Sequence, residues 1–390
     1  MVVFLPMLSP ISIKMQEGIE SDVFPGGELL IAYKNTVCFH KAFGLSQRVP
    51  EPIPLTVNSF FDLASLTKPL ATASAITHLI DKGAFNLEDP VSKFIVEYKK
   101  GGKEKVTLAH LLVHNSGLPD WKPYYEAIRE RNEKSPGFIG SDTAKQAVYQ
   151  MSRDEPLVST PGTDRRYSDI GFILLGEIVE RVSQVPLDQF CDNEIFCGIC
   201  VDGQREDAGA HRAPLRENVV TPAGCGRRSE EIFFQPFGRE RAGRFVATEQ
   251  CPWRNEVLKG KVHDDNCYVM GGVAGHAGLF GTARAVYAIV QDYMTTPPNP
   301  QRPTEAVRSL PPVGVGWDTP SLEGSSSGRF FSKSSFGHLG FTGTSIWVDP
   351  VNALVVILLT NRVHPSRNNE RIRQFRPEIH DIIFQEVIGV

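Results

Sequence analysis

The sequence predicts an α/β fold of the α+β type, with an antiparallel sheet flanked by helices and a mostly helical region inserted into it. Three observations carry this prediction. Strand-like segments lie near the start of the chain, between residues 23 and 44. Helical patterns then dominate as far as about residue 200. Strand-like segments return between residues 340 and 360, and a helical pattern closes the chain.

A single domain is expected over residues 1–390, because no break in composition divides the chain into independent parts. The sheet subdomain should comprise about residues 1–62 and 246–390. The helical subdomain should comprise about residues 63–245.

The N-terminal elements follow from local patterns. A helix is expected over residues 11–20, and a hairpin follows it. Residues 27–33 form its first strand, 34–36 its turn and 37–43 its return strand, because apolar runs flank a short polar turn.

The middle of the chain has helical periodicity in four segments, 107–114, 142–151, 170–182 and 187–196. Ser141 is the expected N-cap of the second. Residues 201–245 are rich in Arg, Glu and Gly and lack periodicity, so we expect an extended surface loop there.

The C-terminal part begins with a glycine-dense connection over residues 271–278. A helix is expected over 282–294, and a linker over 297–303. Two strands are expected over 340–348 and 354–360, joined by a turn at 349–352, before a closing helix over 371–390.

Ser65 is the only serine with a lysine three positions downstream. The pattern from Ser65 to Ile80 predicts a helix, so Ser65 and Lys68 should lie on one face of it. The free N–H groups at a helix start favour developing negative charge. A neutral amine beside a hydroxyl can accept its proton and make it a nucleophile.

Composition excludes several other classes. The formal net charge of −4 argues against nucleic acid as a partner. The longest apolar stretches, such as 353–359, are too short to span a bilayer. The apolar N-terminus lacks a basic lead-in and a clear cleavage site, so we expect a cytoplasmic protein, or a periplasmic one if the start is misplaced.

Seven cysteines, an odd and scattered set, make a disulfide framework unexpected. The pair Cys197 and Cys200 has no partner pair at zinc spacing, so buried thiols are favoured over a metal site. No cofactor and no metal are expected.

Three motifs together resemble the serine β-lactamase and penicillin-binding protein family, in its branch of class C β-lactamases, DD-carboxypeptidases and esterases. They are Ser65-Leu66-Thr67-Lys68, Tyr167-Ser168-Asp169 and His338-Leu339-Gly340. Residues 110–119 resemble the segment that this branch places between the first two motifs. The resemblance spans about residues 20–385 and implies a β-lactamase/transpeptidase-like fold.

The resemblance implies roles for these residues. Ser65 would attack a carbonyl, and Lys68 or Tyr167 would be the general base, a choice that the sequence leaves open. Tyr167 would act as a phenolate whose pKa Lys68 holds down. The N–H groups of Ser65 and Phe341 would form the oxyanion hole, and Gly340 would permit close approach of the backbone to substrate.

Departures from the family pattern narrow the expected substrate. Asp169 stands where the family more often has Asn, and an ionised Asp only accepts hydrogen bonds. His338 replaces a fixed cation, and Leu339 replaces the hydroxyl residue that contacts a penicillin carboxylate. We therefore expect weak activity on β-lactams. A second Thr-Gly pair at Thr342-Gly343 is an alternative register for the third motif, which we do not favour.

His263, Asp264 and His276 form a further group. Their segment resembles relatives known as penicillin-binding protein 4B-like proteins or muramyl amidases. The side chains could line a pocket for a sugar or peptide, cap turns, or bind a divalent metal.

The leading hypothesis is a serine hydrolase that forms an acyl-enzyme on Ser65 with an ester or amide, plausibly a cell-wall peptide or muropeptide. The alternatives are a β-lactamase or carboxylesterase of the same fold, a binding or sensing protein without turnover, and a metallohydrolase using His263, Asp264 and His276. The partner is then a small-molecule or peptide substrate, and the oligomeric state is not predicted.

Overall fold

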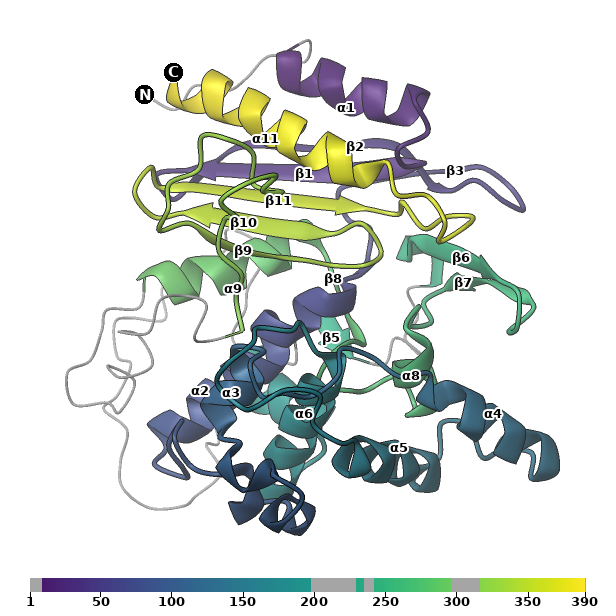
Figure 1. Ribbon diagram of the computed structural model, residues 1–390. Helices are drawn as coiled ribbons and strands as arrows, with labels where there is room; N and C mark the ends of the chain where they lie inside the picture. The colour runs from purple at the N-terminus through teal and green to yellow at the C-terminus, as the bar shows by residue number, and fades with distance from the viewer. Residues whose placement is uncertain (1–8, 198–228, 235–241, 296–315, 390) are drawn as a thin grey trace.

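The computed structural model describes residues 9–197, 229–234, 242–295 and 316–389 (Figure 1). Cys200, most of the expected 201–245 loop and the 297–303 linker lie outside these ranges. Within them, no helix is both long and apolar enough to cross a bilayer.

A six-stranded sheet forms one half of the molecule (Figure 1). Its strand order is β3-β2-β1-β11-β10-β9, and all neighbouring strands are antiparallel. The strands are β1 (Gly26–Tyr33), β2 (Thr36–Gln47), β3 (Ile53–Pro54), β9 (Phe336–Leu339), β10 (Ser345–Asp349) and β11 (Leu354–Thr360). The first and last parts of the chain therefore meet at the centre of the sheet, where Leu29 pairs with Leu358.

Helices α1 (Pro10–Glu20) and α11 (Ile372–Ile388) cover one face of the sheet (Figure 1). Alternate strand residues such as Leu29, Ile31 and Val356 pack against Ile11 and Ile379 in one apolar cluster. Burial of such side chains is worth about 1.5–3 kcal/mol each.

The opposite face carries the intervening residues, including Leu30, Ile346 and Ile357. Helix α9 (Ala283–Thr295) lies against it, and the helical half of the molecule continues the same core (Figure 1). Its remaining helices are α2 (Ser74–Asp81), α3 (Leu108–Leu112), α4 (Tyr124–Lys134), α5 (Asp142–Asp154), α6 (Asp169–Ser183), α7 (Leu187–Phe190) and α8 (Asp265–Val269).

The expected single strand over 340–348 is wrong. Residues 340–344 form a tight turn between β9 and β10, because the Gly340 N–H donates to the Thr344 carbonyl at 2.8 Å. The periodic apolar residues after this turn belong to β10 alone.

One helix, one hairpin and one small sheet were not expected. Helix α4 buries only Tyr124 and Ile128, so its apolar stripe is too thin to be recognised. Strands β6 (Ala247–Cys251) and β7 (Glu256–Lys259) form a hairpin, and β4 (Phe61–Asp62), β8 (Leu279–Gly281) and β5 (Ile232–Phe234) form a small sheet. Strands this short carry little periodic signal.

Candidate active site

Ser65 lies where the chain turns from β4 into the helical half of the molecule. Ala64 adopts the left-handed conformation with φ of 48°, which costs energy for a residue with a Cβ. Asp62 fixes this turn, because its Oδ1 accepts from the Ala64 N–H at 2.9 Å and its Oδ2 accepts from the His263 N–H at 2.6 Å. The strained turn presents Ser65 on the first turn of the helical segment that follows, where N–H groups are unpaired within the helix.

The helix expected from Ser65 to Ile80 is irregular at its start. A 3-10 turn at Ala64–Leu66 leads into a π-helical segment at Lys68–Ala73, and α2 begins at Ser74. Such π-helical turns occur frequently at functional sites. Sequence periodicity does not distinguish such a turn from an α-helix, because the apolar residues still fall on one face of the helix.

Lys68 is fully buried, and its ammonium has three contacts. Nζ donates to Ser65 Oγ at 2.9 Å and to the His276 carbonyl at 3.1 Å. It also lies 2.7 Å from Oδ1 of Asp169. Burial alone lowers the pKa of Lys68, but Asp169 and Tyr167 outweigh it, so the net pKa is raised. The resting Lys68 is therefore an ammonium and not the neutral amine that the sequence suggested.

Tyr167 stands over Lys68, whose Nζ is 4.9 Å from the centre of the phenol ring. Burial of the hydroxyl raises the pKa of Tyr167 to about 12, although Lys68 acts to lower it. The expected net lowering of this pKa is thus wrong: desolvation favours the neutral phenol more strongly than the ammonium favours a phenolate. The residue as a whole is nevertheless 39% exposed.

His114 holds Tyr167 in place and was not expected to do so. Its carbonyl accepts from the Arg166 N–H at 2.7 Å, and its Nδ1 accepts from the Ser168 N–H at 3.0 Å. Its ring lies 4.5 Å from that of Tyr167. The resemblance of residues 110–119 to a family segment was visible in the sequence. It did not indicate which side chain of that segment points toward Tyr167.

Asp169 begins helix α6, which Ser168 caps by accepting from the Gly171 N–H at 3.2 Å. The Asp169 N–H donates to the Asp120 carbonyl at 2.8 Å. These bonds fix the helix start beside Lys68, so the Lys68–Asp169 pair joins the first and second motifs.

Strand β9 brings the third motif to the same place. The His338 ring lies 5.9 Å from that of Tyr167. Gly340 packs so closely that an added Cβ would lie 2.0 Å from Thr344 Oγ1 and 2.8 Å from the Leu63 carbonyl. Only glycine allows β9 to approach the Ser65 turn in this way.

Thr342 supports the favoured register of the third motif. Its Oγ1 donates to the Asp62 carbonyl at 2.8 Å, and its side chain is buried. The hydroxyl therefore ties the β9–β10 turn to the segment before Ser65, and it is not presented to substrate.

The peptide between Gly340 and Phe341 has a fixed orientation. The Gly340 carbonyl accepts from the Gly343 N–H at 3.0 Å, and in a trans peptide the Phe341 N–H then points the opposite way. Within the described ranges this N–H donates to no protein acceptor.

His338 does not supply the cation that its position suggests. Burial lowers its pKa to about 4, so the imidazole is neutral at neutral pH. Its Nδ1 lies 2.9 Å from the Leu339 carbonyl and therefore carries the proton, which leaves Nε2 as an acceptor.

His276 and Asp264 adjoin Lys68. Oδ1 of Asp264 lies 2.9 Å from Nε2 of His276, whose carbonyl accepts from Lys68. Burial acts to raise the pKa of Asp264, but His276, the Cys267 N–H and Lys68 together lower it, so this carboxylate is ionised.

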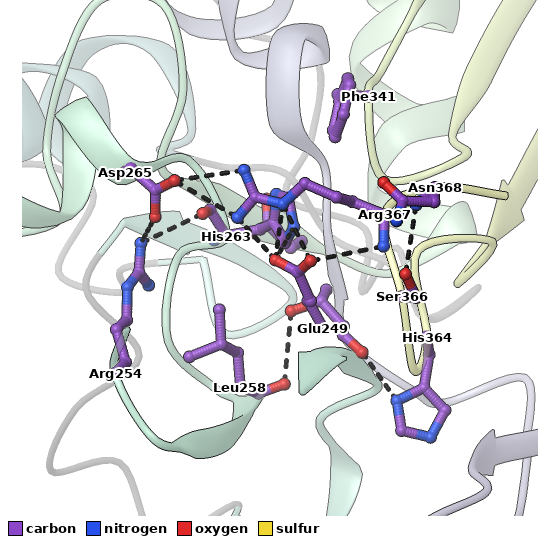
Figure 2. A network of polar contacts seen from close by, with 12 residues as sticks. Glu249, Arg254, Leu258, His263, Asp265, Phe341, His364, Ser366, Arg367 and Asn368 are labelled. Carbon is purple, nitrogen blue, oxygen red and sulfur yellow. Dashed lines mark hydrogen bonds and ion pairs between the residues drawn. The ribbon is translucent and has the colours of Figure 1, made fainter. Parts of the chain in front are cut away.

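The His263 side chain contacts Phe341 and not the Asp264–His276 pair; His263 and Phe341 are both labelled in Figure 2. The two rings stack with centres 5.6 Å apart. Behind them Arg367 bridges Glu249 and Asp265, and Asp265 also pairs with Arg254 at 2.5 Å (Figure 2). This network of ion pairs connects the β6–β7 hairpin, α8 and the chain after β11.

Of the three predicted residues, His276 thus contacts Lys68 through its carbonyl and Asp264 through its ring, whereas the buried ring of His263 stacks on Phe341. Across the described part of the chain, no three or more His, Cys, Asp or Glu side chains converge as metal ligands would.

Comparison with known proteins places this geometry in a family. The Beta-lactamase family model matches residues 14–379, so the chain belongs to that family. With Ser65, Lys68 and Tyr167 gathered in one site, the protein is a serine hydrolase of the Beta-lactamase family.

Similar proteins have several names. A Salmonella agona protein named "Putative D-alanyl-D-alanine carboxypeptidase" is 28% identical over 382 residues, which cover 90% of this chain and 81% of that protein. The octameric penicillin-binding protein homologue from Pyrococcus abyssi superposes with a TM-score of 0.67 at 19% identity, covering 97% of this chain and 77% of the other. EstCE1, a hydrolase with promiscuous acyltransferase activity, superposes with a TM-score of 0.64 at 19% identity, covering 94% and 97%. The superpositions establish the antiparallel sheet and helices of the β-lactamase/transpeptidase fold.

Proposed function

We propose that the protein hydrolyses an ester or amide through an acyl-enzyme on Ser65. The observation that carries the proposal is the bond from the buried Lys68 ammonium to Ser65 Oγ, at 2.9 Å. Fully buried lysines are rare and often have a functional role, and Lys68 contacts the hydroxyl that would react.

The base is the Lys68–Tyr167 pair after it has lost one proton. That proton is shared between the amine and the phenol, and either group in its basic form can accept the Ser65 proton. Ser65 Oγ then attacks the carbonyl carbon, and the N–H groups of Ser65 and Phe341 stabilise the oxyanion. The protonated pair returns the proton to the leaving group, and water repeats the cycle on the acyl-enzyme.

We propose that the substrates are cell-wall peptides or muropeptides. The name of the Salmonella relative supports a peptide as the acyl part of the substrate and says nothing of this protein's leaving group. The segment with His263, Asp264 and His276 carries the finer resemblance to the penicillin-binding protein 4B-like or muramyl amidase subgroup, and these residues contact Lys68 or Phe341 directly or through one another. Transfer of the acyl group to an amine or alcohol would use the same intermediate.

Turnover of p-nitrophenyl acetate and butyrate by the wild type and Lys68→Met tests the proposal. Loss of the proton-accepting group should lower kcat/KM by about 100-fold or more. Lys93→Met is the matched control, because Lys93 also lies 2.7 Å from an aspartate, Asp89, but at an exposed site. Wild-type turnover by Lys68→Met would contradict the mechanism.

A further inference from the structure

We propose that the site selects esters and amides whose leaving group carries no free carboxylate, because the Lys68 ammonium at Ser65 is already paired with Asp169 and a second carboxylate, Asp264, lies close by. The inference rests on the proposed acyl-enzyme mechanism and narrows its substrate class. It separates this protein from an enzyme that releases a C-terminal amino acid, since that leaving group bears a carboxylate.

Two cations near the site, Lys68 and Arg165, are each paired with an aspartate. The Lys68 ammonium lies 2.7 Å from Asp169. Arg165, which precedes Tyr167 by two residues, is 51% exposed at its side chain and lies 2.5 Å from Asp318. A substrate carboxylate would have to compete with a protein carboxylate for either partner.

Two further arginines near the oxyanion turn are occupied by main-chain carbonyls. Arg362 donates to the carbonyls of Phe341, Arg367 and Asn369 at 2.6–3.0 Å. Arg376 is buried and donates to the Thr344 carbonyl at 3.0 Å. Both side chains hold the turn, and neither extends toward a ligand at Ser65.

The two imidazoles beside Tyr167, those of His114 and His338, are neutral and therefore provide no positive charge for a substrate carboxylate. Burial lowers the pKa of both His114 and His338. The His338 Nε2, which is buried and has no protein partner within the described residues, is an acceptor and would repel an anionic oxygen. The His114 Nε2, equally buried and without a partner in the described chain, carries a proton and suits a neutral carbonyl or hydroxyl.

Carboxylates remain on two sides of the nucleophile. Asp169 lies on the α6 side, and Asp264, with a side chain that is 25% exposed, lies on the α8 side. Bringing a third carboxylate between them would cost both desolvation and repulsion.

The rim of the site is instead aromatic. Tyr167, which stands over Lys68, and Phe341, on the turn after β9, are 39% and 51% exposed, and Trp121 is 43% exposed. Trp121 follows Asp120, whose carbonyl accepts from the Asp169 N–H. Exposed aromatic surface around a nucleophile favours an uncharged, apolar or ring-shaped substrate group.

A matched pair of thioesters tests the proposal. N-benzoyl-D-alanyl thioglycolate and the corresponding thioglycolamide share the acyl group and the scissile bond and differ only in carboxylate against carboxamide. The released thiol is measured for each substrate. To correct for the intrinsic reactivity of the two thioesters, each kcat/KM is divided by the rate constant for hydrolysis of the same thioester by hydroxide. The wild type should favour the thioglycolamide by about tenfold or more, which corresponds to about 1.4 kcal/mol.

Asp169→Asn should reduce this preference at least several-fold, because it removes one negative charge and frees the Lys68 charge. Asp89→Asn, which alters an exposed Asp–Lys pair, should leave the preference unchanged. A wild type that hydrolyses the thioglycolate as fast as the amide, or an unchanged preference in Asp169→Asn, would overturn the inference while leaving the acyl-enzyme intact. If neither thioester nor any p-nitrophenyl ester acylates Ser65, the proposed function itself fails.

Discussion

Lys68 and Asp169 form an ion pair inside the site, with 2.7 Å between Nζ and Oδ1. The same ammonium donates to the Ser65 hydroxyl. An asparagine at residue 169 would leave the lysine charge unbalanced, whereas the aspartate neutralises it and favours the protonated form. The pair therefore controls how readily the site produces its base.

The pH dependence of kcat/KM follows from this pair. Because the pKa of Lys68 is raised and that of Tyr167 is about 12, the basic form of the pair is scarce at neutral pH and increases as the pH rises. We expect kcat/KM for a neutral ester to rise between pH 6 and 9. In Asp169→Asn the pKa of Lys68 should fall, so this rise should move to lower pH. A flat profile in both proteins would contradict the assignment.

Gly340→Ala should impair both stability and activity. The new Cβ would meet Thr344 Oγ1 and the Leu63 carbonyl, so β9 must move away from the Ser65 turn. Overpacking of this kind costs about 1–3 kcal/mol, and it should also lower kcat by displacing the Phe341 N–H. Urea unfolding and ester turnover measure the two effects. Gly243→Ala is the control, because nothing lies within 4 Å of its added Cβ, and equal losses in both variants would refute the explanation.

Asp62→Ala should destabilise the turn that presents Ser65. It leaves the N–H groups of Ala64 and His263 without their acceptors, at a cost of about 1–3 kcal/mol for each buried donor. Asp62→Asn retains one accepting oxygen and should lose less. The free energy of unfolding from urea titration should therefore rank wild type above Asp62→Asn and Asp62→Ala last; a different order would count against this role.

His338 should make the protein less stable in acid. Burial and Lys68 lower its pKa to about 4, against the influence of Asp318 and Asp169, while an unfolded chain has the ordinary value of about 6.5. Between these values the unfolded state binds the extra proton, so the free energy of unfolding falls as the pH drops from 6.5 to 4. His338→Gln cannot bind this proton. Its free energy of unfolding should fall less than that of the wild type between pH 7 and pH 4.5, and parallel losses would exclude His338 as the cause.

Several parts of the site could be predicted from the sequence because chemistry and spacing are local there. Ser65 and Lys68 lie within one turn, and the pattern from Ile170 onward identified α6 with little error. The fold class followed from the order of strands and helices, and the family and superposed structures confirm it.

Other parts depend on contacts that a single sequence does not reveal. The pKa of Tyr167 is decided by burial in the folded site, and the sequence showed only its cationic neighbour. The inward turn of His114 depends on a left-handed backbone conformation, with φ of 61°. Asp62 was overlooked, although an aspartate two residues before Ala64 is typical of a turn that the side chain caps.

The most direct test of the account is the intact mass of the wild type and Ser65→Ala after exposure to a fluorophosphonate probe. The account predicts one covalent adduct per chain in the wild type and none in Ser65→Ala, with the adduct mapped to Ser65. Equal labelling of both proteins, or no labelling of a folded wild type, would show that Ser65 is not an activated nucleophile.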